Sequence, residues 1–272
     1  MIRCRPLLGT FVEITCDDGG AIDAGFAAIE RVHRLMSFHA EDSDLARLRR
    51  APAGSPVPVA PETAAVLRLA LELHRESSGL FDVAVGARLV RTGFLPCPAG
   101  VDLAACDGTS ADLELAPDGH AICHRAMLLD LGGIAKGFAV DRAVAAMREA
   151  GATGGLVNAG GDMRAFGPRA FLVAIRRADG REQQSRVLRG RAFASSDNGG
   201  TRRRRWGRVQ TPHLGFGRSI RSRGVTSVVA PDCATADAMT KVALADPALA
   251  SAMLARRGGF ICAPGREAAD AA

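Results

Sequence analysis

Aromatic residues are scarce in this sequence of 272 residues, which has one tryptophan, no tyrosine and an aromatic content of 4%. Surfaces that bind single-stranded nucleic acid stack bases on aromatic rings, and the arginine run Arg202–Arg205 has no rings interleaved with it. The net charge of +6 favours anionic partners in general, without distinguishing nucleic acid from other anions. We therefore expect no nucleic-acid partner, and an arginine run that is either solvated or binds an acidic partner or a phosphate.

Paired cysteines are also lacking. The seven cysteines are scattered and odd in number, and no two of them form a CxxC pair. This pattern argues against a disulfide framework and a zinc site, and it favours a reducing compartment. No secretory signal and no membrane-spanning apolar stretch is recognisable. We expect a cytoplasmic protein without a transmembrane segment. A hydrophobic content of 47% over residues 1–272 can build the core of one large domain or of two interlocked lobes.

Lysine is the rarest basic residue, since only Lys136 and Lys241 among the 35 Lys+Arg residues are lysines. An ammonium group is a compact charge that suits a phosphate or a crowded polar pocket, whereas guanidinium suits flat bidentate pairing. Both lysines lie in segments that look like motifs, so we interpret them as candidate functional cations. The alternative is that both are ordinary lysines on helix surfaces.

The segment Asp130–Asp141, which reads DLGGIAKGFAVD, is the centre of the chemical predictions. The apolar run Met127–Leu129 before it predicts a short buried strand, and the pair Gly132–Gly133 gives the backbone freedom for a sharp turn. Apolar residues then recur at helical spacing up to Gly151, which predicts the end of a helix. The free amides in the first turn of that helix can bind an anion, and Lys136 adds a full positive charge there.

The rest of the chain predicts a mixture of strands and helices. Strands are expected at 6–16, 155–158, 171–175 and 225–230, a hairpin within 97–126, and helices at 22–36, after 42–44 and at 62–78. A last helix begins with Thr235 as its N-cap. Glycines follow the strands on both sides of the central helix, so both turns should lie on one sheet edge, where ligands tend to bind. The expected fold class is α+β.

Two acidic residues outside the central segment are further candidates. Asp82 lies alone in the apolar run Leu80–Gly86, where an unpaired carboxylate would be costly, so it either caps a turn or binds a ligand. Asp237 precedes Lys241 by four residues, so the two share one face near the start of a helix. The alternative for this pair is a surface ion pair of a few tenths of a kcal/mol.

Six blocks, taken in order, resemble those of the FAD:protein FMN transferases, also called ApbE-type flavin transferases. The blocks are LGT (8–10), MSFHAEDSDLARL (36–48), SGLFDVAVG (78–86), DLGGIAKGFAVD (130–141), VNAGGDMRAFG (157–167) and ATADAMTKVAL (234–244). Together they span nearly the whole chain. The most specific pairing is DLGGIAKG followed by NAGGD.

This resemblance implies an α+β fold with mixed sheets flanked by helices, in which two interlocked lobes form one unit with the ligand cleft between them. It also implies an enzyme that binds FAD and, with Mg²⁺, transfers the FMN moiety to a Thr or Ser hydroxyl of an acceptor flavoprotein. The product is a phosphoester, and AMP is released. Two alternatives stay open, namely hydrolysis of FAD to FMN and AMP, and a catalytically weakened protein that binds FAD.

The resemblance also assigns roles to particular residues. Those matching positions that contact FAD are Leu8, Phe38, Leu80, Phe81, Asp82, Asp130 and Lys136, and we add Lys241 to this set. For the metal, Gly133 matches the position that gives a backbone carbonyl, and Asp237 the position that gives a carboxylate. His213 matches the histidine of the HIIDPxTG block and is the candidate general base, because imidazole titrates near neutral pH. With Lys136 and Asp237 it makes the candidate catalytic set.

The sequence departs from the family pattern in three places. The HIIDPxTG block reads HLGFGRSI at 213–220, and the TSG block reads SSD at 195–197. The second metal side chain, often a threonine, falls on Lys241, whose protonated amine has no lone pair for a metal. Either Thr240 takes that place, or the Lys241 ammonium stands where the cation would be. We expect weaker binding of Mg²⁺ than the family norm.

Overall fold

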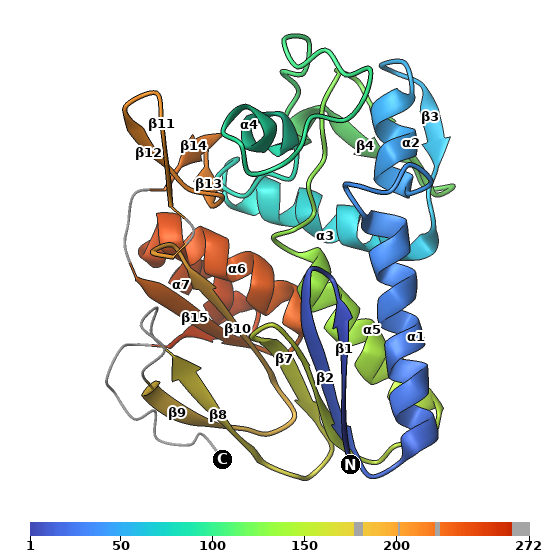
Figure 1. The fold of residues 1–272 in the computed structure, drawn as a ribbon, viewed down its shortest axis with the longest axis vertical. Helices are drawn as coiled ribbons and strands as arrows, with labels where there is room; N and C mark the ends of the chain where they lie inside the picture. The colour runs from blue at the N-terminus through green and yellow to red at the C-terminus, as the bar shows by residue number, and fades with distance from the viewer. Residues whose placement is uncertain (177–181, 201, 221–223, 263–272) are drawn as a thin grey trace.

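An antiparallel sheet forms the largest part of the fold (Figure 1). The computed structural model describes residues 1–176, 182–200, 202–220 and 224–262, and within these the sheet has seven strands. Neighbouring strands are antiparallel throughout. In spatial order the strands are β1 (Ile2–Leu7), β2 (Thr10–Cys16), β6 (Gly155–Ala159), β7 (Asp162–Phe166), β10 (Ala192–Asp197), β15 (Val225–Ala230) and β16 (Phe260–Ile261).

Helices pack against one face of this sheet. They are α1 (Gly19–Met36), α5 (Ala135–Glu149) and α6 (Cys233–Ala245), with α7 (Pro247–Arg256) beside β16. The apolar positions of α1 recur every three or four residues, and Ile22, Phe26 and Ile29 are fully buried. Each such side chain stabilises the fold by roughly 1.5–3 kcal/mol. They belong to a continuous core whose members run from Val12 to Leu254.

A hairpin covers part of the opposite face. Its strands are β8 (Phe171–Arg176) and β9 (Glu182–Leu188), and they pair antiparallel. Because side chains alternate between the two faces of a strand, Ala192 and Ala194 of β10 join the main core while Phe193 points to the other side. There Phe193 meets Val173 and Leu188 of the hairpin in a second, smaller apolar cluster.

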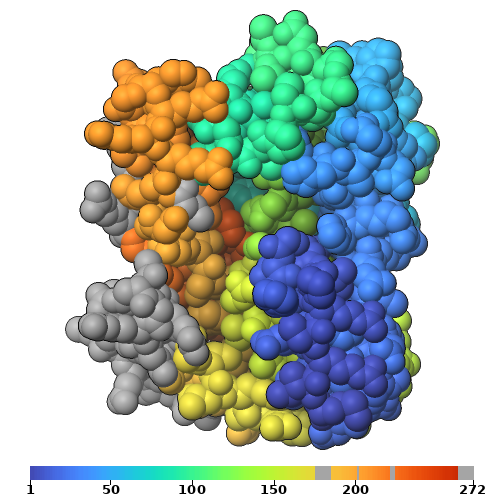
Figure 2. Space-filling model, viewed as in Figure 1, coloured from blue at the N-terminus to red at the C-terminus, as the bar shows by residue number. Residues whose placement is uncertain are grey.

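The second lobe consists of shorter elements. It contains α2 (Asp44–Arg50), α3 (Pro61–Glu76), α4 (Gly86–Arg91), the 3-10 helix η1 (Ser110–Asp112), and a small sheet of β3 (Pro56–Pro58), β5 (His120–Cys123) and β4 (Leu113–Leu115). Two hairpins lie beside α4, formed by β11 (Arg203–Arg205) with β12 (Arg208–Gln210) and by β13 (Leu214–Gly215) with β14 (Arg218–Ser219). Figure 2 shows the face hollowed near its centre, between these segments above and the N-terminal strands below.

The predicted fold class is confirmed. Helices and antiparallel sheets combine in two lobes, and the chain passes between the lobes several times, so the lobes are interlocked (Figure 1). The helices predicted at 22–36, after 42–44 and at 62–78 are α1, α2 and α3, and the hairpin within 97–126 is β4–β5. The stop predicted at Gly151 is also confirmed, because this residue has a positive φ of 95° directly after the helix C-cap.

Three local predictions are wrong. Residues 6–16 are not one strand, because Leu8 and Gly9 have positive φ and turn the chain between β1 and β2. Met127–Leu129 is buried but forms no strand. Only isolated backbone hydrogen bonds join this stretch to 83–86, where the Leu128 carbonyl accepts from Gly86 and the Asp130 amide donates to Val83. The N-cap of α6 is Asp232, whose side chain accepts from the Thr235 amide at 2.7 Å.

Candidate active site between the lobes

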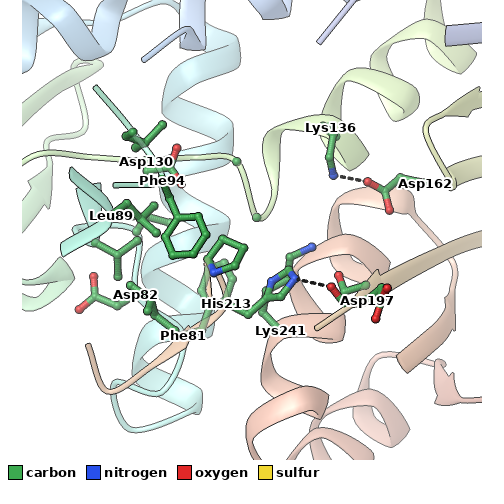
Figure 3. Close-up of a pocket in the computed structure, with 18 of the residues that line it drawn as sticks. Phe81, Asp82, Leu89, Phe94, Asp130, Lys136, Asp162, Asp197, His213 and Lys241 are labelled. Carbon is green, nitrogen blue, oxygen red and sulfur yellow. Dashed lines mark hydrogen bonds and ion pairs between the residues drawn. The ribbon is translucent and has the colours of Figure 1, made fainter. Parts of the chain in front are cut away.

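A cavity of about 430 Å³ opens between the two lobes. Its lining comes from α4 and the segments on both sides of it, from the turn before α5, from α5 and α6, from the turn between β6 and β7, from the end of β10 and from the start of β13 with the residues before it. Figure 3 shows several of these side chains pointing into it. The titratable residues of the lining are Asp82, Asp130, Lys136, Asp162, Asp197, His213 and Lys241. The two glycine turns predicted to share a sheet edge therefore do meet at one site.

Two lysines and two aspartates form an ion-pair cluster at one end of the cavity. Lys136 Nζ contacts the Asp162 carboxylate and lies 3.5 Å from Asp237 Oδ2, and Lys241 Nζ contacts Asp237 Oδ1. The side chains of Asp162 and Asp237 are 3% and 0% exposed, whereas Lys136 and Lys241 are 30% and 14% exposed. The ammonium groups therefore reach the cavity and Asp237 lies beneath them. The alternatives of ordinary surface lysines and of a surface ion pair are wrong.

Helices α5 and α6 hold this cluster in place because amides in the first turn of each donate to a carboxylate of the other. Asp237 of α6 accepts a hydrogen bond from the Gly137 amide, at 3.2 Å, in the first turn of α5. Asp141 of α5 accepts hydrogen bonds from the amides of Cys233 and Ala234, at 2.8–2.9 Å, in the first turn of α6. Free amides and the helix dipole favour a carboxylate at both places. The anion site predicted at the start of α5 is thus filled by Asp237.

This arrangement needs glycine where the two helices meet. A Cβ atom on Gly137 would lie 2.2 Å from the Cys233 carbonyl oxygen, so no side chain fits between α5 and the start of α6. A second close approach lies at the cavity wall, where Gly160 has a φ of 63° and a Cβ atom would lie 2.4 Å from Thr10 Oγ1. Gly137 allows the backbones of the two helices to approach each other, and Gly160 leaves room for the Thr10 side chain beside the cavity.

Burial and ion pairing act in opposite directions within the cluster. Burial by itself would lower the pKa of Lys136, but the carboxylates of Asp237 and Asp162 raise it above the ordinary value. Burial would raise the pKa of Asp237, but Lys136 and Lys241 bring it below the usual range. Burial and the neighbouring charge of Asp237 raise the pKa of Asp162. Asp237 therefore holds its negative charge more firmly than Asp162 does.

His213 lies in the same cavity, next to the end of β10 (Figure 3). Its Nε2 is 3.3 Å from the carbonyl oxygen of Asp197, which assigns the proton to Nε2 and leaves Nδ1 as the acceptor. Burial, and then the positive charge of Lys241, lower the pKa of His213 to about 4. The expectation that this imidazole titrates near neutral pH is therefore wrong. At pH 7 it is neutral and able to accept a proton.

Two further predicted residues line the cavity from the second lobe. Asp82 Oδ1 accepts hydrogen bonds from Ser110 Oγ and the Ala84 amide, both at 2.7 Å, so its role in a turn is confirmed. Its contact with a ligand stays a prediction. Burial raises the pKa of Asp130, and a hydrogen bond from the Gly132 amide opposes this shift. Phe81 and Gly133 also line the cavity.

Five predicted residues do not line the cavity, and one of them is Asp237, which is buried beneath the ammonium groups. Leu8 lies in the turn between β1 and β2, Leu80 belongs to the main core, and Phe38 packs with Ala87 in a cluster under α4. Thr240 is fully buried. Its hydroxyl lies 2.7 Å from both the Asp237 carbonyl oxygen and Ser196 Oγ, so it is used within the fold.

Sequence reasoning missed part of the site. Asp162 ends the NAGGD block, so a signal was present, but its ion pair with Lys136 depends on a contact between distant segments. The apolar wall of Val85, Leu89, Phe94 and Leu95 left no periodic signal, because a short helix and loops provide it. Figure 3 shows Leu89 and Phe94 on the side of the cavity opposite Lys136 and Asp162.

The arrangement suits a ligand with two chemically different parts. The apolar wall can pack against a flat, weakly polar ring system, and the ammonium groups can bind an anionic group. The cavity volume lies within the range of roughly 300–1,000 Å³ that small-molecule sites occupy. Across the described parts of the chain, no group of three or more His, Cys, Asp or Glu residues is placed to hold a metal ion. The helices described there include none with the length and apolar character needed to cross a membrane.

Similar solved structures include two ApbE proteins. The ApbE protein of Thermotoga maritima superposes with a TM-score of 0.83 at 23% identity, covering 96% of this chain and 93% of that one. The apo form of the flavinyl transferase ApbE of Pseudomonas stutzeri gives a TM-score of 0.80 at 21% identity, covering 98% and 92%. At these identities the likeness shows a shared fold.

Curated relatives carry one common name. The FAD:protein FMN transferase of Treponema pallidum is 31% identical over 160 residues, which are 54% of this chain and 44% of that protein. The FAD:protein FMN transferase of Vibrio cholerae is 28% identical over 147 residues, 51% of this chain and 44% of that protein. The matched part thus spans about half the length of these relatives. A family model described as the ApbE family matches residues 8–262. The chain belongs to the ApbE family.

Proposed function

We propose that this protein is an FAD:protein FMN transferase, which transfers the FMN moiety of FAD to a Thr or Ser hydroxyl of an acceptor flavoprotein and releases AMP. The observation that carries the proposal is the meeting of Lys136 and Lys241 over Asp237, at one end of a cavity whose other side is apolar. Such a site fits a diphosphate bridge beside an aromatic ring system. The names of the curated relatives support the same substrate.

The proposed reaction is a displacement at one phosphorus atom. The acceptor hydroxyl oxygen attacks the phosphorus of the FMN half, the bond from this phosphorus to the bridging oxygen breaks, and AMP leaves with that oxygen. Lys136 and Lys241 stabilise the charge that develops on the phosphates. A unit charge about 4 Å away contributes roughly 4 kcal/mol at an effective dielectric of 20. Nδ1 of His213, which is neutral, accepts the hydroxyl proton.

Magnesium, which the family resemblance implies, does not fit the donor set of this chain. Mg²⁺ requires oxygen donors in near-octahedral geometry. Asp237 Oδ1 already accepts from Lys241, and Oδ2 accepts from the Gly137 amide and lies near Lys136. The Thr240 hydroxyl is used within the fold, and an ammonium group has no lone pair. No step of the proposed reaction therefore runs through this metal.

The test is incubation of the purified protein with FAD, first alone and then with a candidate acceptor flavoprotein. We expect a mass increase of the acceptor equal to the FMN moiety, together with free AMP. Release of FMN and AMP with no modified acceptor would identify a pyrophosphatase instead. Binding of FAD without any AMP would identify a catalytically weakened FAD-binding protein.

Lys136→Met tests the role of the cluster in the same assay. Loss of one positioned donor to a developing charge costs about 10²–10³-fold in rate. We expect a loss of this order for Lys136→Met. Arg142→Met is the matched control, because Arg142 is a cation on the same helix with an exposed side chain. Equal rates for the two variants would contradict the proposed role.

A further inference from the structure

Lys241 contacts the carboxylate expected to bind the metal, and its stem passes beside Gly133, the other residue expected to do so. Its Nζ contacts Asp237 Oδ1 and is 3.1 Å from the Asp237 carbonyl oxygen. Its side-chain carbons pass along Gly133, where a Cβ atom would lie 3.5 Å from Lys241 Cε. The ammonium group is thus held beside the Asp237 carboxylate while the stem passes the Gly133 turn. These are the carboxylate and the backbone position that the family pattern gives to the cation.

We infer that the Lys241 ammonium is a built-in replacement for the divalent cation, so that this site binds the diphosphate of its nucleotide without Mg²⁺. The inference deepens the proposed function and rests on it for the identity of the nucleotide. The positive charge is tethered to α6 four residues after Asp237, so it is present before any ligand binds. It faces the same cavity as Lys136, and the two ammonium groups can bind the diphosphate together.

The ammonium and a metal ion would compete for the same carboxylate, Asp237. A metal ion at this place would have to displace Lys241 from a carboxylate that is fully buried. The displaced ammonium would lose its ion pair with Asp237, and Lys136, whose Nζ lies 3.5 Å from Asp237 Oδ2, would repel the metal ion. Asp237 is therefore already paired with a cation that belongs to the chain itself, the ammonium group of Lys241.

Titration with Mg²⁺ alone tests the inference independently of FAD. We expect the wild-type protein to show no binding heat, and its Tm to stay unchanged when about 10 mM MgCl₂ is added, because a ligand that does not bind cannot stabilise the fold. Lys241→Thr removes the ammonium and supplies a hydroxyl oxygen, so we expect this variant to gain both binding heat and a higher Tm with Mg²⁺. Lys241→Met removes the charge without supplying oxygen and is the matched control, for which we expect weaker binding than for Lys241→Thr.

Wild-type protein that binds Mg²⁺ as tightly as Lys241→Thr would overturn the inference. So would a folded Lys241→Thr variant, verified by circular dichroism, that gains no Mg²⁺ binding. If neither variant folds, the wild-type titration still decides, because the inference requires that the wild type does not bind the metal.

Binding of FAD, followed by flavin fluorescence, provides the second measurement. We expect the wild-type Kd for FAD to change less than about twofold between EDTA and Mg²⁺, and the Kd of Lys241→Thr to rise about tenfold or more in EDTA. A wild-type Kd that depends on Mg²⁺ would overturn the inference. Absence of FAD binding under every condition would instead refute the proposed function, while the titration with Mg²⁺ alone would still test the cation site.

Discussion

At the residue scale, the environment of His213 decides which chemistry its imidazole can perform. Burial lowers its pKa to about 4, so the neutral form dominates at neutral pH. Because only the neutral imidazole accepts a proton, the protonation of His213 should not change the transfer rate above about pH 5. The rate should fall as the pH decreases through 4. The pH profile of kcat/KM, together with an NMR titration of the imidazole, checks this expectation.

Removal of the imidazole should affect catalysis more than binding. We expect His213→Gln to lower the transfer rate by about 10²-fold, the lower end of the range for a general base, because an imidazole with a pKa of about 4 is a weak base at neutral pH, and we expect little change in the Kd for FAD. His33→Gln is the control, because His33 is exposed on α1. An unchanged rate in His213→Gln would contradict the assignment.

Single residues of the site were predictable where the sequence itself was unusual. The scarcity of lysine directed attention to Lys136 and Lys241, and the structure places both at the cavity. The acidic partner of Lys136 in β7 and the low pKa of His213 were not predictable, because both depend on burial and on contacts between segments distant in the sequence. Leu8, Phe38 and Leu80 were assigned by resemblance, and their contact with FAD stays a prediction.

At the scale of elements, the close contact between the first turns of α5 and α6 predicts a strong effect of a small substitution. Gly137→Ala would bring Cβ to 2.2 Å from a backbone oxygen, so one helix must shift. We expect the free energy of unfolding to fall by about 1–3 kcal/mol or more through overpacking, although alanine has the better helix propensity. Urea unfolding measures this change.

Gly133→Ala is the matched control for that substitution. A Cβ atom there would meet only the flexible Lys241 side chain, at 3.5 Å, which is ordinary van der Waals contact. We expect a change in the free energy of unfolding within about 0.5 kcal/mol. Equal destabilisation by the two substitutions would show that the contact between Gly137 and Cys233 is not the cause.

Asp141, the carboxylate of α5 that accepts from the first turn of α6, predicts a dependence of stability on pH. Burial raises the pKa of Asp141 to about 6, against an ordinary value of 3.8. Between these values the folded protein binds a proton that the unfolded chain does not, so stability decreases as pH rises from about 4 to about 6. The shift corresponds to roughly 3 kcal/mol. Urea unfolding of wild type and Asp141→Asn across this range should show the advantage of the wild type shrinking with pH, and a constant difference would contradict the assignment.

Elements with a complete amphipathic period were predictable from the sequence, and those without one were not. The residues of α1 and α3 bury one face at regular spacing, and both helices were expected. Met127–Leu129 has the apolar composition of a buried strand, but only isolated backbone hydrogen bonds join this region to residues 83–86. Its apolar composition predicted burial correctly but could not show whether it pairs with another strand. The turn at Leu8–Gly9 was missed because Leu8 adopts a positive φ that favours glycine.

At the scale of the whole molecule, the continuous core predicts one unfolding transition. Core residues come from both lobes, including Leu67 and Leu73 of α3 and Val157 of β6. We expect residues 1–272 to behave as a single unit, so that thermal unfolding followed by circular dichroism and by tryptophan fluorescence gives the same midpoint. Trp206 is the one tryptophan and lies in the β11–β12 turn of the second lobe, so it reports on that lobe. Two separate midpoints would contradict a single unit.

The two carboxylate caps that join α5 and α6 also limit which changes in length the chain can accept. In each helix the capped amide and the capping acid are four residues apart, at Gly137 and Asp141 in one and at Cys233 and Asp237 in the other. Deletion of one residue within either interval would turn the acid by about 100° around the helix axis and displace it by about 1.5 Å. Changes in chain length that keep both contacts are therefore expected only outside these two intervals.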